Sequence, residues 1–421
     1  MAFSAPTLLS PTIIAKEALM SLTNHMVMGG LVHRGYEDEL RKPIGGILTI
    51  RKPNKFQVTK QRTRVTSFIS EKSITLEVAT QAHVSWEFTM ASLATTIEKY
   101  KERYIEPAAA ELANVIDLDL CALYDDIANQ VEETSSWNSN PASFLCLGKA
   151  AQKMDEEAVP QQNRVLVLNP AANWSLANAL RTVYVVDIAK PALRKGYLAT
   201  IAGMEIFMDQ NINVHTTGDW HFDTNTTTVV HQTAAMTSKT TNDTISIIGV
   251  GRTASEAFKV GDVFSIAGVY AVNPMSKVST GTLRQFVVTA DASCIDTTFT
   301  SLGLTLLYIS PALVHTGPDK NVDTLPAGAA AIFFQGNIRK NQPMNLAFHK
   351  NAFALVMVPL AVPDGAWGHS MTHAGISIRV YKGFNIDSDI EAIRMDILYG
   401  VKTLYPELAC RVMGAEASAS A

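Results

Sequence analysis

The sequence predicts an α+β protein in which an all-β domain is inserted into a mixed host domain. Helical and strand-like patterns alternate up to about residue 214, whereas from residue 215 to about 345 every strong pattern is strand-like. Strand patterns then continue through residues 353–413. The β-rich segment therefore interrupts a fold instead of following it, which is typical of an inserted domain.

The first expected element is an N-terminal helix. Ser10 and Pro11 are typical of a helix start, because serine caps the first turn and proline fits its geometry. The glycine pair at 29–30 is expected to end this helix at Met28. One face of the helix is apolar, so it must pack against another element. This face consists of Ile14, Ala18, Leu22 and Val27.

Residues 45–90 alternate apolar and polar side chains, which predicts β-strands. Pro53 and Asn54 interrupt the alternation, and the pattern resumes after them. These long, half-polar segments favour an extended hairpin over a closed core. The hairpin would carry six basic residues, namely Arg51, Lys52, Lys55, Lys60, Arg62 and Arg64.

These six residues have two interpretations. They could bind nucleic acid through phosphate contacts that release counterions. Alternatively, they could pair with acidic patches on neighbouring subunits, which would also discourage edge-to-edge aggregation. We favour the second interpretation, because the segment lacks the run of aromatic side chains that a base-stacking platform needs.

Residues 92–130 carry the strongest helical signal, with apolar side chains at spacings of three and four. A continuous helix of this length would measure on the order of 50 Å, which indicates a structural spine. Pro107 lies inside the pattern and is expected to kink the helix, since it lacks a backbone N–H.

The segment before the insert combines helices and strands. We expect a helix at about 141–157, a short buried strand at 165–168 that ends at Asn169, a helix at about 174–189, and strand-like alternation after Gly203. Within the insert, short strands separated by turn signals predict a small barrel or sandwich. After the insert, three strand-rich segments are expected, at 353–362, 376–384 and 393–413.

Bulk composition restricts the class of protein. Apolar residues make up 47% of the 421 residues and charged residues only 18%, which indicates that partners cover much of the surface. The net charge of −4 argues against a strongly basic nucleic-acid binder. The four cysteines form no CxxC pair, so neither a disulfide framework nor a structural zinc site is expected. Neither a signal peptide nor a membrane span is expected.

No motif supports catalysis, a cofactor or a metal ion. His369 and His373 have the i, i+4 spacing of helical metal ligands, but the surrounding glycines favour a loop and no third ligand follows. Residues 249–255 are glycine-bearing, but they lack the lysine of a phosphate-binding loop. No nucleophile elbow occurs. We therefore expect a protein that is not an enzyme.

Several segments resemble the coat protein family of tailed bacteriophages that phage P22 typifies. They occur in the family's order and share its strand and turn strings, such as VPQQNRVLVLNP and ISIRVYKGFNIDSD. The matching segments are 45–53, 159–170, 196–212, 259–274, 345–360, 376–389 and 395–414. One departure is that the stretch between Val230 and Lys259 is short for the acidic loop that some members use between capsomeres.

The resemblance implies the HK97-like capsid fold of tailed phages, with an inserted β domain. It implies the following division of the chain: an N-terminal arm at 1–35, an extended loop at 36–80, a peripheral domain with the spine helix at 81–135, the first axial part at 136–214, the inserted β-rich domain at 215–345, and the second axial and peripheral part with a C-terminal tail at 346–421.

The resemblance also implies the function of a major capsid protein that encloses double-stranded DNA in an icosahedral head. Its expected partners are further copies of itself in pentamers and hexamers, a scaffolding protein, a portal protein at one vertex, and packaged DNA bound without sequence preference. It would reside in the virion and, during assembly, in the host cytoplasm. The alternative is an encapsulin-like shell protein of a cellular nanocompartment, which shares the fold.

Overall fold

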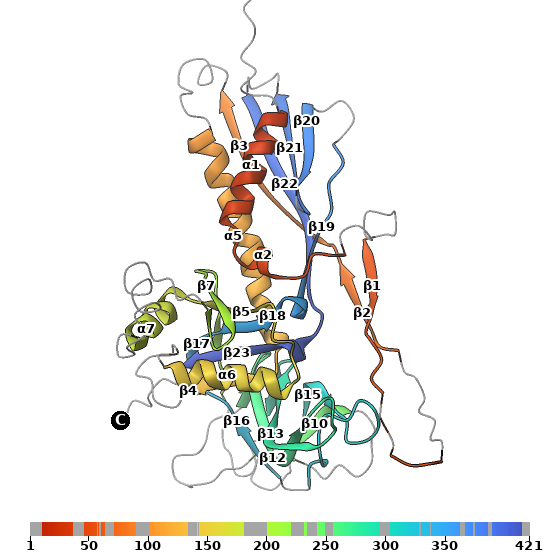
Figure 1. Cartoon of the computed structure of the whole chain (residues 1–421). Coiled ribbons are helices and arrows are strands. Elements are labelled where there is room, and N and C mark those ends of the chain that lie inside the picture. The colour runs from red at the N-terminus through yellow and green to blue at the C-terminus, as the bar shows by residue number, and fades with distance from the viewer. Residues whose placement is uncertain are drawn as a thin grey trace, which may run out of the picture. The chain divides into compact units, whose positions relative to one another are not determined.

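The computed structural model describes residues 11–36, 46–56, 58, 60–63, 71–89, 101–133, 141, 143–180, 200–219, 231–233, 242–248, 256–294, 304–327, 330–336, 338–362, 367–373, 375–385 and 390–414 (Figure 1). The chain divides into two compact units. Unit 1 comprises residues 1–52, 73–120 and 353–404, and unit 2 comprises 53–72, 121–352 and 405–421. Each unit therefore joins segments that lie far apart in the sequence.

The centre of unit 1 is an antiparallel sheet organised by one long strand, β22 (Ile390–Thr403). The first half of β22 pairs with β21 (Ile376–Asn385), and its last residues pair with β19 (Phe353–Met357). On its other side it pairs with β3 (Thr80–Thr89). The strand β20 (Trp367–His373) completes the sheet beside β21.

Helix α1 (Pro11–His25) packs against β20 and β21. The expected apolar face is confirmed for Ile14, Ala18 and Leu22, which are fully buried or nearly so. The predicted end at Met28 is wrong, because a second short helix, α2 (Met28–Leu31), contains the glycine pair. The carboxylate of Asp117 accepts hydrogen bonds from the backbone N–H groups of residues 27 and 29, at 2.7 and 3.0 Å, and so supports this new start.

The spine helix is shorter than its sequence pattern. A π-helical turn (Lys101–Ile105) leads into α5 (Glu106–Ala122), and a 3₁₀ turn (Leu123–Asp126) follows. Residues 92–100 lie outside the described residues. The predicted continuation to residue 130 is wrong, because the backbone becomes extended at Ile127. Pro107 is the second residue of α5, directly after the π-helical turn.

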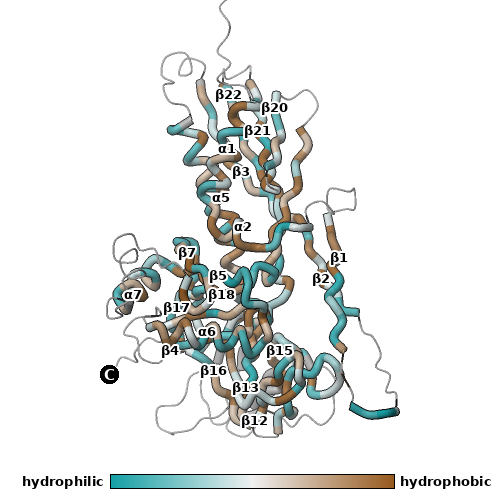
Figure 2. The backbone as a smooth tube through the Cα atoms, in the orientation of Figure 1, coloured by the Kyte–Doolittle hydropathy of each residue, from teal (hydrophilic) through white to brown (hydrophobic). Residues whose placement is uncertain are grey.

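The extended loop begins as a two-stranded ribbon. β1 (Ile47–Arg51) pairs with β2 (Ser73–Glu77) in an antiparallel register from Ile47↔Glu77 to Arg51↔Ser73. The predicted break at Pro53 and Asn54 is confirmed, but the strand pattern expected to resume at Lys55 is wrong for residues 55, 56, 58 and 60–63, which form no strand. Pro53 explains the end of β1, because it cannot donate to a ladder. Figure 2 shows residues 60–63 as hydrophilic.

Unit 2 contains a mixed six-stranded sheet. Its order is β4 (Gln130–Glu133), β23 (Ala409–Gly414), β18 (Asn345–His349), β5 (Arg164–Leu168), β7 (Met204–Met208) and β6 (Thr200–Ile201). The pairs β4–β23 and β5–β7 are parallel, and the others are antiparallel. The predicted buried strand at 165–168 is confirmed, since all of β5 is buried.

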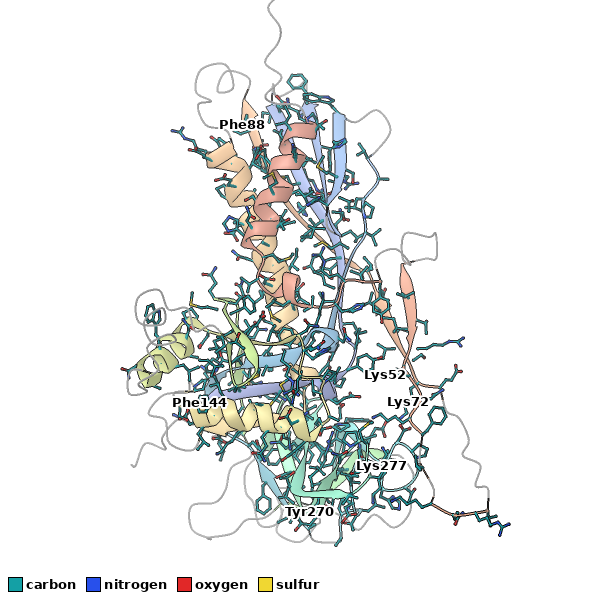
Figure 3. All side chains as sticks on the ribbon, in the orientation of Figure 1. Lys52, Lys72, Phe88, Phe144, Tyr270 and Lys277 are labelled. Carbon is teal, nitrogen blue, oxygen red and sulfur yellow. The ribbon has the colours of Figure 1, made fainter. Side chains whose placement is uncertain are left out.

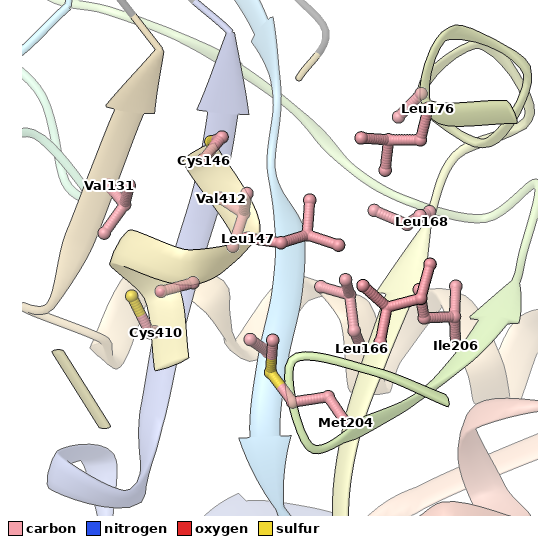
Figure 4. Packing of buried hydrophobic residues seen from close by; sticks show 14 of the residues in the cluster. Val131, Cys146, Leu147, Leu166, Leu168, Leu176, Met204, Ile206, Cys410 and Val412 are labelled. Carbon is pink, nitrogen blue, oxygen red and sulfur yellow. The ribbon is translucent and has the colours of Figure 1, made fainter. Parts of the chain in front are cut away.

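Two helices pack on this sheet and enclose its apolar core (Figure 4). Helix α6 (Phe144–Glu156) starts at Ser143, whose hydroxyl accepts a hydrogen bond from the Cys146 N–H at 3.3 Å. Helix α7 (Pro170–Leu180) starts four residues earlier than predicted, because Asn169 caps it by accepting from the Ala172 N–H at 2.8 Å. The core contains Leu147, Leu166, Leu168, Met204, Ile206, Cys410 and Val412.

The predicted inserted β domain is present as a closed six-stranded barrel. Around the barrel the order is β10 (Asn242–Ile248), β15 (Leu304–Leu313), β13 (Ser279–Val288), β12 (Val263–Val272), β16 (Ala331–Phe334) and β9 (His231–Thr233). Phe264, Phe286 and Leu307 fill its interior and are fully buried. A barrel of this kind has no free edge and carries its own core.

The two ends of the insert lie side by side. β8 (Val214–Thr216) enters the insert and β17 (Asn341–Pro343) leaves it, and the two strands pair antiparallel. Two short strands, β11 (Glu256–Phe258) and β14 (Ala292–Cys294), pair in a small antiparallel ribbon. In the sequence, β11 follows barrel strand β10 and β14 follows barrel strand β13. Adjacent entry and exit strands allow a domain to be inserted without disrupting its host.

Candidate functional site: the extended loop and the barrel joint

The extended loop presents its basic residues along one segment. Arg51 ends β1 and is exposed, while Lys52 is half-buried. Lys55, Lys60 and Arg62 are exposed. Arg64 lies outside the described residues. A single stretch of chain therefore presents several cations to solvent.

The loop also exposes apolar side chains, which sequence reasoning missed. Phe56 is 71% exposed and Val58 is 86% exposed. The available signal was their spacing of two within a polar segment, which places both on one side of an extended chain. Among the described large apolar side chains of the loop, these two are the most exposed.

Helix α5 in unit 1 carries an exposed stripe of mixed character. Val115 and Leu118 are 38% and 47% exposed, and Tyr104 near the helix start is 36% exposed. Glu111, one turn before Val115, is also exposed. The spacings of three, four and seven residues place these side chains on one face of the helix. This face offers apolar contact beside a carboxylate.

Arg411 lies at the joint where the host sheet of unit 2 meets the barrel, and its side chain is fully buried. Its guanidinium donates to the Ile127 carbonyl from Nε at 2.9 Å and from Nη2 at 2.6 Å, and to the Gly261 carbonyl from Nη1 at 2.7 Å. Burial lowers the pKa of Arg411 to about 10. One side chain of β23 therefore connects the end of the spine segment to the barrel.

Gly261 is required at this joint. Its φ of +93° is a left-handed conformation, and an added Cβ would lie 2.5 Å from the Asp125 carboxylate. Burial raises the pKa of Asp125, although the charge of Arg411 acts in the opposite direction. The close packing of a carboxylate, a guanidinium and a bare backbone leaves no room for a side chain at this position.

Tyr124, His215 and Asp262 form a hydrogen-bonded chain beside Arg411. The Tyr124 hydroxyl lies 3.2 Å from His215 Nδ1, and His215 Nε2 lies 2.9 Å from Asp262 Oδ1. Burial raises the pKa of Tyr124. The three residues are only 8%, 5% and 1% exposed, so a substrate cannot reach them. The chain therefore has the geometry of a structural bond network between the host and the barrel.

Two further contacts connect the barrel to the host sheet. Arg284 of β13 and Glu157, which follows α6, form an ion pair in which each side chain is 7% exposed. The Gln285 side chain accepts from the Gln130 N–H at 3.0 Å and donates to the Gln130 carbonyl at 2.8 Å. This amide thus occupies the edge of β4 as a neighbouring strand would, and it blocks further pairing there.

In unit 1, the buried carboxylate of Asp396 on β22 holds three strands in register. It accepts from Arg379 on β21, from Arg394 Nε at 2.6 Å and from Gln81 Nε2 on β3 at 3.1 Å. Breaking one partner of such a buried set is costly, because it leaves charge without compensation. The register of the sheet is therefore specified by buried ion pairs and hydrogen bonds as well as by apolar packing.

The predicted histidine pair and the cysteines Cys146 and Cys410 lie in the described part of the chain. His369 and His373 lie on strand β20, so the predicted loop is wrong there. Among the described residues, no group of three or more His, Cys, Asp or Glu side chains could hold a metal ion. Burial raises the pKa of the Cys146 and Cys410 thiols to about 12, which keeps them protonated and unreactive. No helix of the described segments is long and apolar enough to span a membrane.

A cleft of about 410 Å³ separates α6 from the barrel. Most of its lining residues are of polar type, including Lys149 and Lys153 from the helix and Gln285 and Thr282 from β13. Glu156 in the same wall accepts from Gln152 at 2.9 Å. The lining contains no histidine, no cysteine and no pair of carboxylates.

Comparison with known proteins gives one family match. The family model described as "P22 coat protein - gene protein 5" matches residues 1–414. No curated protein matches. Solved structures with similar folds include one from Mycobacterium phage Che8, with 15% identity over 93% of this chain and 91% of that chain and a TM-score of 0.49.

Two further structures are similar at lower identity. The capsid of the cyanophage P-SCSP1u has 11% identity over 89% of this chain and 84% of that chain, with a TM-score of 0.46. The capsid of Ralstonia phage GP4 has 9% identity over 91% of this chain and 86% of that chain, with a TM-score of 0.44. At such identities and scores the family match, which spans nearly the whole chain, is the finding that decides the assignment.

An α+β host with a spine helix, an extended loop and an inserted barrel defines a shell-building structural subunit. The chain belongs to the P22 coat protein family. It is a major capsid protein, which forms the head shell of the virion from many copies of itself. The nanocompartment alternative is not favoured by this match.

Proposed function

We propose that the extended loop fastens each subunit to a neighbour in the shell. The observation that supports this most directly is the exposure of Phe56 and Val58 among several lysines and arginines. Apolar side chains give a contact its affinity, and the surrounding charges select its partner and register. In this proposal Arg51, Lys52, Lys55, Lys60, Arg62 and Arg64 contact neighbouring copies.

The exposed stripe of α5 on a second copy has matching chemistry. In an extended chain Phe56, Val58 and Lys60 face one side, and about 13 Å separates the first from the last. On the helix, Leu118 and Val115 stand near Glu111, about 10 Å from Leu118 along the axis. An antiparallel placement would bring the apolar pair onto the apolar pair and the ammonium near the carboxylate.

We propose that Pro107 allows the spine helix to bend. Its position after a π-helical turn supports this role, because such turns are common sites of local bending. A subunit that can bend here could occupy places of different curvature in a closed shell.

The division of the chain and its remaining partners complete the proposal. The arm, loop, peripheral, axial and inserted segments keep the boundaries given above, and the paired strands β8 and β17 support the insertion near residues 215 and 345. The subunit would act without catalysis. It would assemble in the host cytoplasm with a scaffolding protein and a portal protein, and would enclose double-stranded DNA without sequence preference.

Deletion of residues 48–66 tests the role of the loop. We expect a soluble, folded subunit that forms no closed shells when it is co-expressed with its scaffold, as judged by electron microscopy. Normal particles from the deletion variant would refute the role of the loop.

A charge exchange tests the proposed partner. Lys60→Glu should reduce closed shells, and Glu111→Lys in the same chain should restore them, because the pair is re-formed with opposite polarity. Lys350→Glu, at another exposed lysine, is the matched control and should leave assembly unchanged. Failure of the second substitution to restore shells would exclude α5 as the partner but not the loop itself.

A further inference from the structure

Strand β3 lies beside β22 in the sheet of unit 1 (Figure 1). All ten residues of β3 pair with β22, from Thr80↔Tyr399 to Thr89↔Ile390, without a shift of register. Among the described residues, no strand pairs with the other edge of β3. This edge also lacks the usual protection against pairing, because β3 contains neither proline nor lysine and has no bulge. A long, unprotected strand edge is a site at which another strand can be added.

The register determines which backbone groups of β3 point toward this edge. The Leu398 carbonyl of β22 accepts from the Val358 N–H at 3.0 Å, on the side of β22 that faces away from β3. Because backbone direction alternates along a strand, Tyr399 and the other odd-numbered residues of β22 bond to the even-numbered residues of β3. The outward residues of β3 are therefore Gln81, His83, Ser85 and Glu87. All four are exposed, and the described part of the chain provides no partner for their backbone N–H and C=O groups.

One face of β3 lies toward the spine helix. Phe88 packs against Tyr104, which precedes α5, with 5.0 Å between the ring centroids (Figure 3). At the other end of β3, Tyr399 pairs with Thr80 and donates to the Asp119 carboxylate near the end of α5 at 2.5 Å. β3 and α5 therefore run in opposite directions. The exposed stripe of α5 begins with Tyr104, so it lies on the side of the helix that meets β3.

The extended loop contains a strand pattern that matches this edge. Phe56, Val58 and Lys60 alternate with polar residues in the sequence, yet their described backbone forms no strand. Such a segment needs a partner ladder before it becomes a strand. The charges are also compatible, because the loop is basic, whereas β3 carries Glu87 and neither lysine nor arginine. A strand pattern without a ladder and a strand edge without a neighbour thus occur in the same chain.

We propose that the loop segment with Phe56, Val58 and Lys60 of a second copy adds to the outer edge of β3 as a further strand. This inference rests on the proposed role of the loop and specifies how the loop binds. A loop segment that is antiparallel to α5 is parallel to β3, and its three named side chains then lie on the face of the sheet that carries α5. Main-chain hydrogen bonds to the four outward residues of β3 supply affinity, and the side chains next to α5 select the partner.

Hydrogen exchange at single residues, compared between wild-type shells and unassembled full-length subunits, tests the added strand. In shells, the amides of the four outward residues of β3 and of Gln61 in the loop should exchange at least about fivefold more slowly, the factor that corresponds to one backbone hydrogen bond. The amides of Ala82 and Val84 bond to β22 and should be protected already in the free subunit. Equal exchange of the outward amides in shells and free subunits would overturn the proposal.

Ser85→Pro is a second test, because proline is tolerated in an edge strand where the N–H points away from the ladder. The unassembled variant should keep the wild-type melting temperature, yet it should form no closed shells with its scaffold. Ser85→Ala keeps the N–H and is the matched control, with normal shells. Normal shells from Ser85→Pro would overturn the proposal, and if this variant does not fold, the exchange measurement on wild-type shells decides alone.

The loop-deletion variant separates this inference from the proposed function. If the variant forms no shells and the outward amides of β3 stay unprotected in wild-type shells, the loop fastens subunits but not by strand addition. If the variant forms shells in which these amides are still protected, another segment covers the edge, and the loop is excluded as its occupant.

Discussion

Arg411 is a single guanidinium inside the apolar strand β23, and its hydrogen bonds connect three distant parts of the chain. Arg411→Ala should destabilise the subunit by about 3–5 kcal/mol, because the carbonyls of Ile127 and Gly261 lose their donors inside the protein. Arg411→Lys should rescue little, since an ammonium cannot reproduce the fork of donors. Urea unfolding of the unassembled subunit measures both effects.

Arg339→Ala is the control for this prediction. The Arg339 side chain is 73% exposed and pairs with Asp219 at the surface, so its removal should change the free energy of unfolding by less than about 1 kcal/mol. A similar loss for Arg411→Ala and Arg339→Ala would contradict the role assigned to the buried guanidinium.

Asp125 gives a pH-dependent prediction at the same joint. Burial raises the pKa of this carboxyl above its value in the unfolded chain, so the folded protein binds the proton more tightly. Above the pKa that Asp125 has in the folded protein, its ionised carboxylate lowers the free energy of unfolding. Below the ordinary pKa of 3.8 the carboxyl group is protonated in both the folded and the unfolded chain, so it causes no loss of stability. Asp125→Asn should raise the melting temperature at pH 7, and the gain should vanish as the pH falls toward 4. A gain that is independent of pH would contradict this explanation.

The partners of Arg411 could not be predicted from the sequence. Its acceptors at Ile127 and Gly261 are separated from it by 284 and 150 residues, and they are backbone carbonyls, which no side-chain pattern reveals. The available signal was one arginine between Cys410 and Val412 in a buried strand. Such a position indicates a satisfied buried charge but does not identify what satisfies it.

At the scale of elements, local periodicity predicted well where burial is one-sided. The apolar face of α1 and the strands of the barrel follow from spacings of 3.6 and two, whereas β5, which is buried throughout, follows from its continuous apolar run. The pattern failed at helix ends that depend on capping groups. The Asp117 carboxylate supports the start of α2, and Asn169 moves the start of α7 to Pro170.

The extended loop shows a second limit of periodicity. Residues 55–63 alternate as a strand does, yet the described part of this segment forms none. A strand requires a partner ladder, and beyond Arg51 the chain provides no partner within the described residues of the same subunit. The pattern therefore records which side chains share a side, and it does not establish that the backbone is paired.

Pro107→Ala separates helix stability from helix shape. Pro107 is the second residue of α5, and proline is tolerated in the first turn of an α-helix, so the substitution should change the free energy of unfolding by less than about 0.5 kcal/mol. If Pro107 allows the spine helix to bend, the same variant should produce shells of altered size or incomplete closure in electron micrographs. The exposed Pro160→Ala is the control. Wild-type particle sizes for Pro107→Ala would remove the proposed role.

At the scale of the whole molecule, the barrel and the host depend on each other unequally. The barrel has its own closed sheet and a core that includes Phe264, Phe286 and Leu307. Three groups of the barrel bond to buried groups of the host. The Gly261 carbonyl accepts from Arg411, Arg284 pairs with Glu157, and the Gln285 side chain bonds to the backbone of Gln130. Separation should therefore cost the host its polar joint while the barrel core remains intact.

An excised fragment of residues 215–345 is expected to fold alone as a β module, because its core and its strand pairing lie within the fragment. It should give a dispersed amide spectrum by NMR and unfold cooperatively in urea. Phe264→Ala should abolish this folding, since truncation of a fully buried phenylalanine costs about 3–5 kcal/mol, which is a large fraction of the stability of so small a domain. Phe333→Ala, at a side chain that is 50% exposed, should leave the fragment folded. A collapsed, poorly dispersed spectrum from the unmodified fragment would mean that contacts from Arg411, Glu157 and Gln130 are needed for the barrel to form at all.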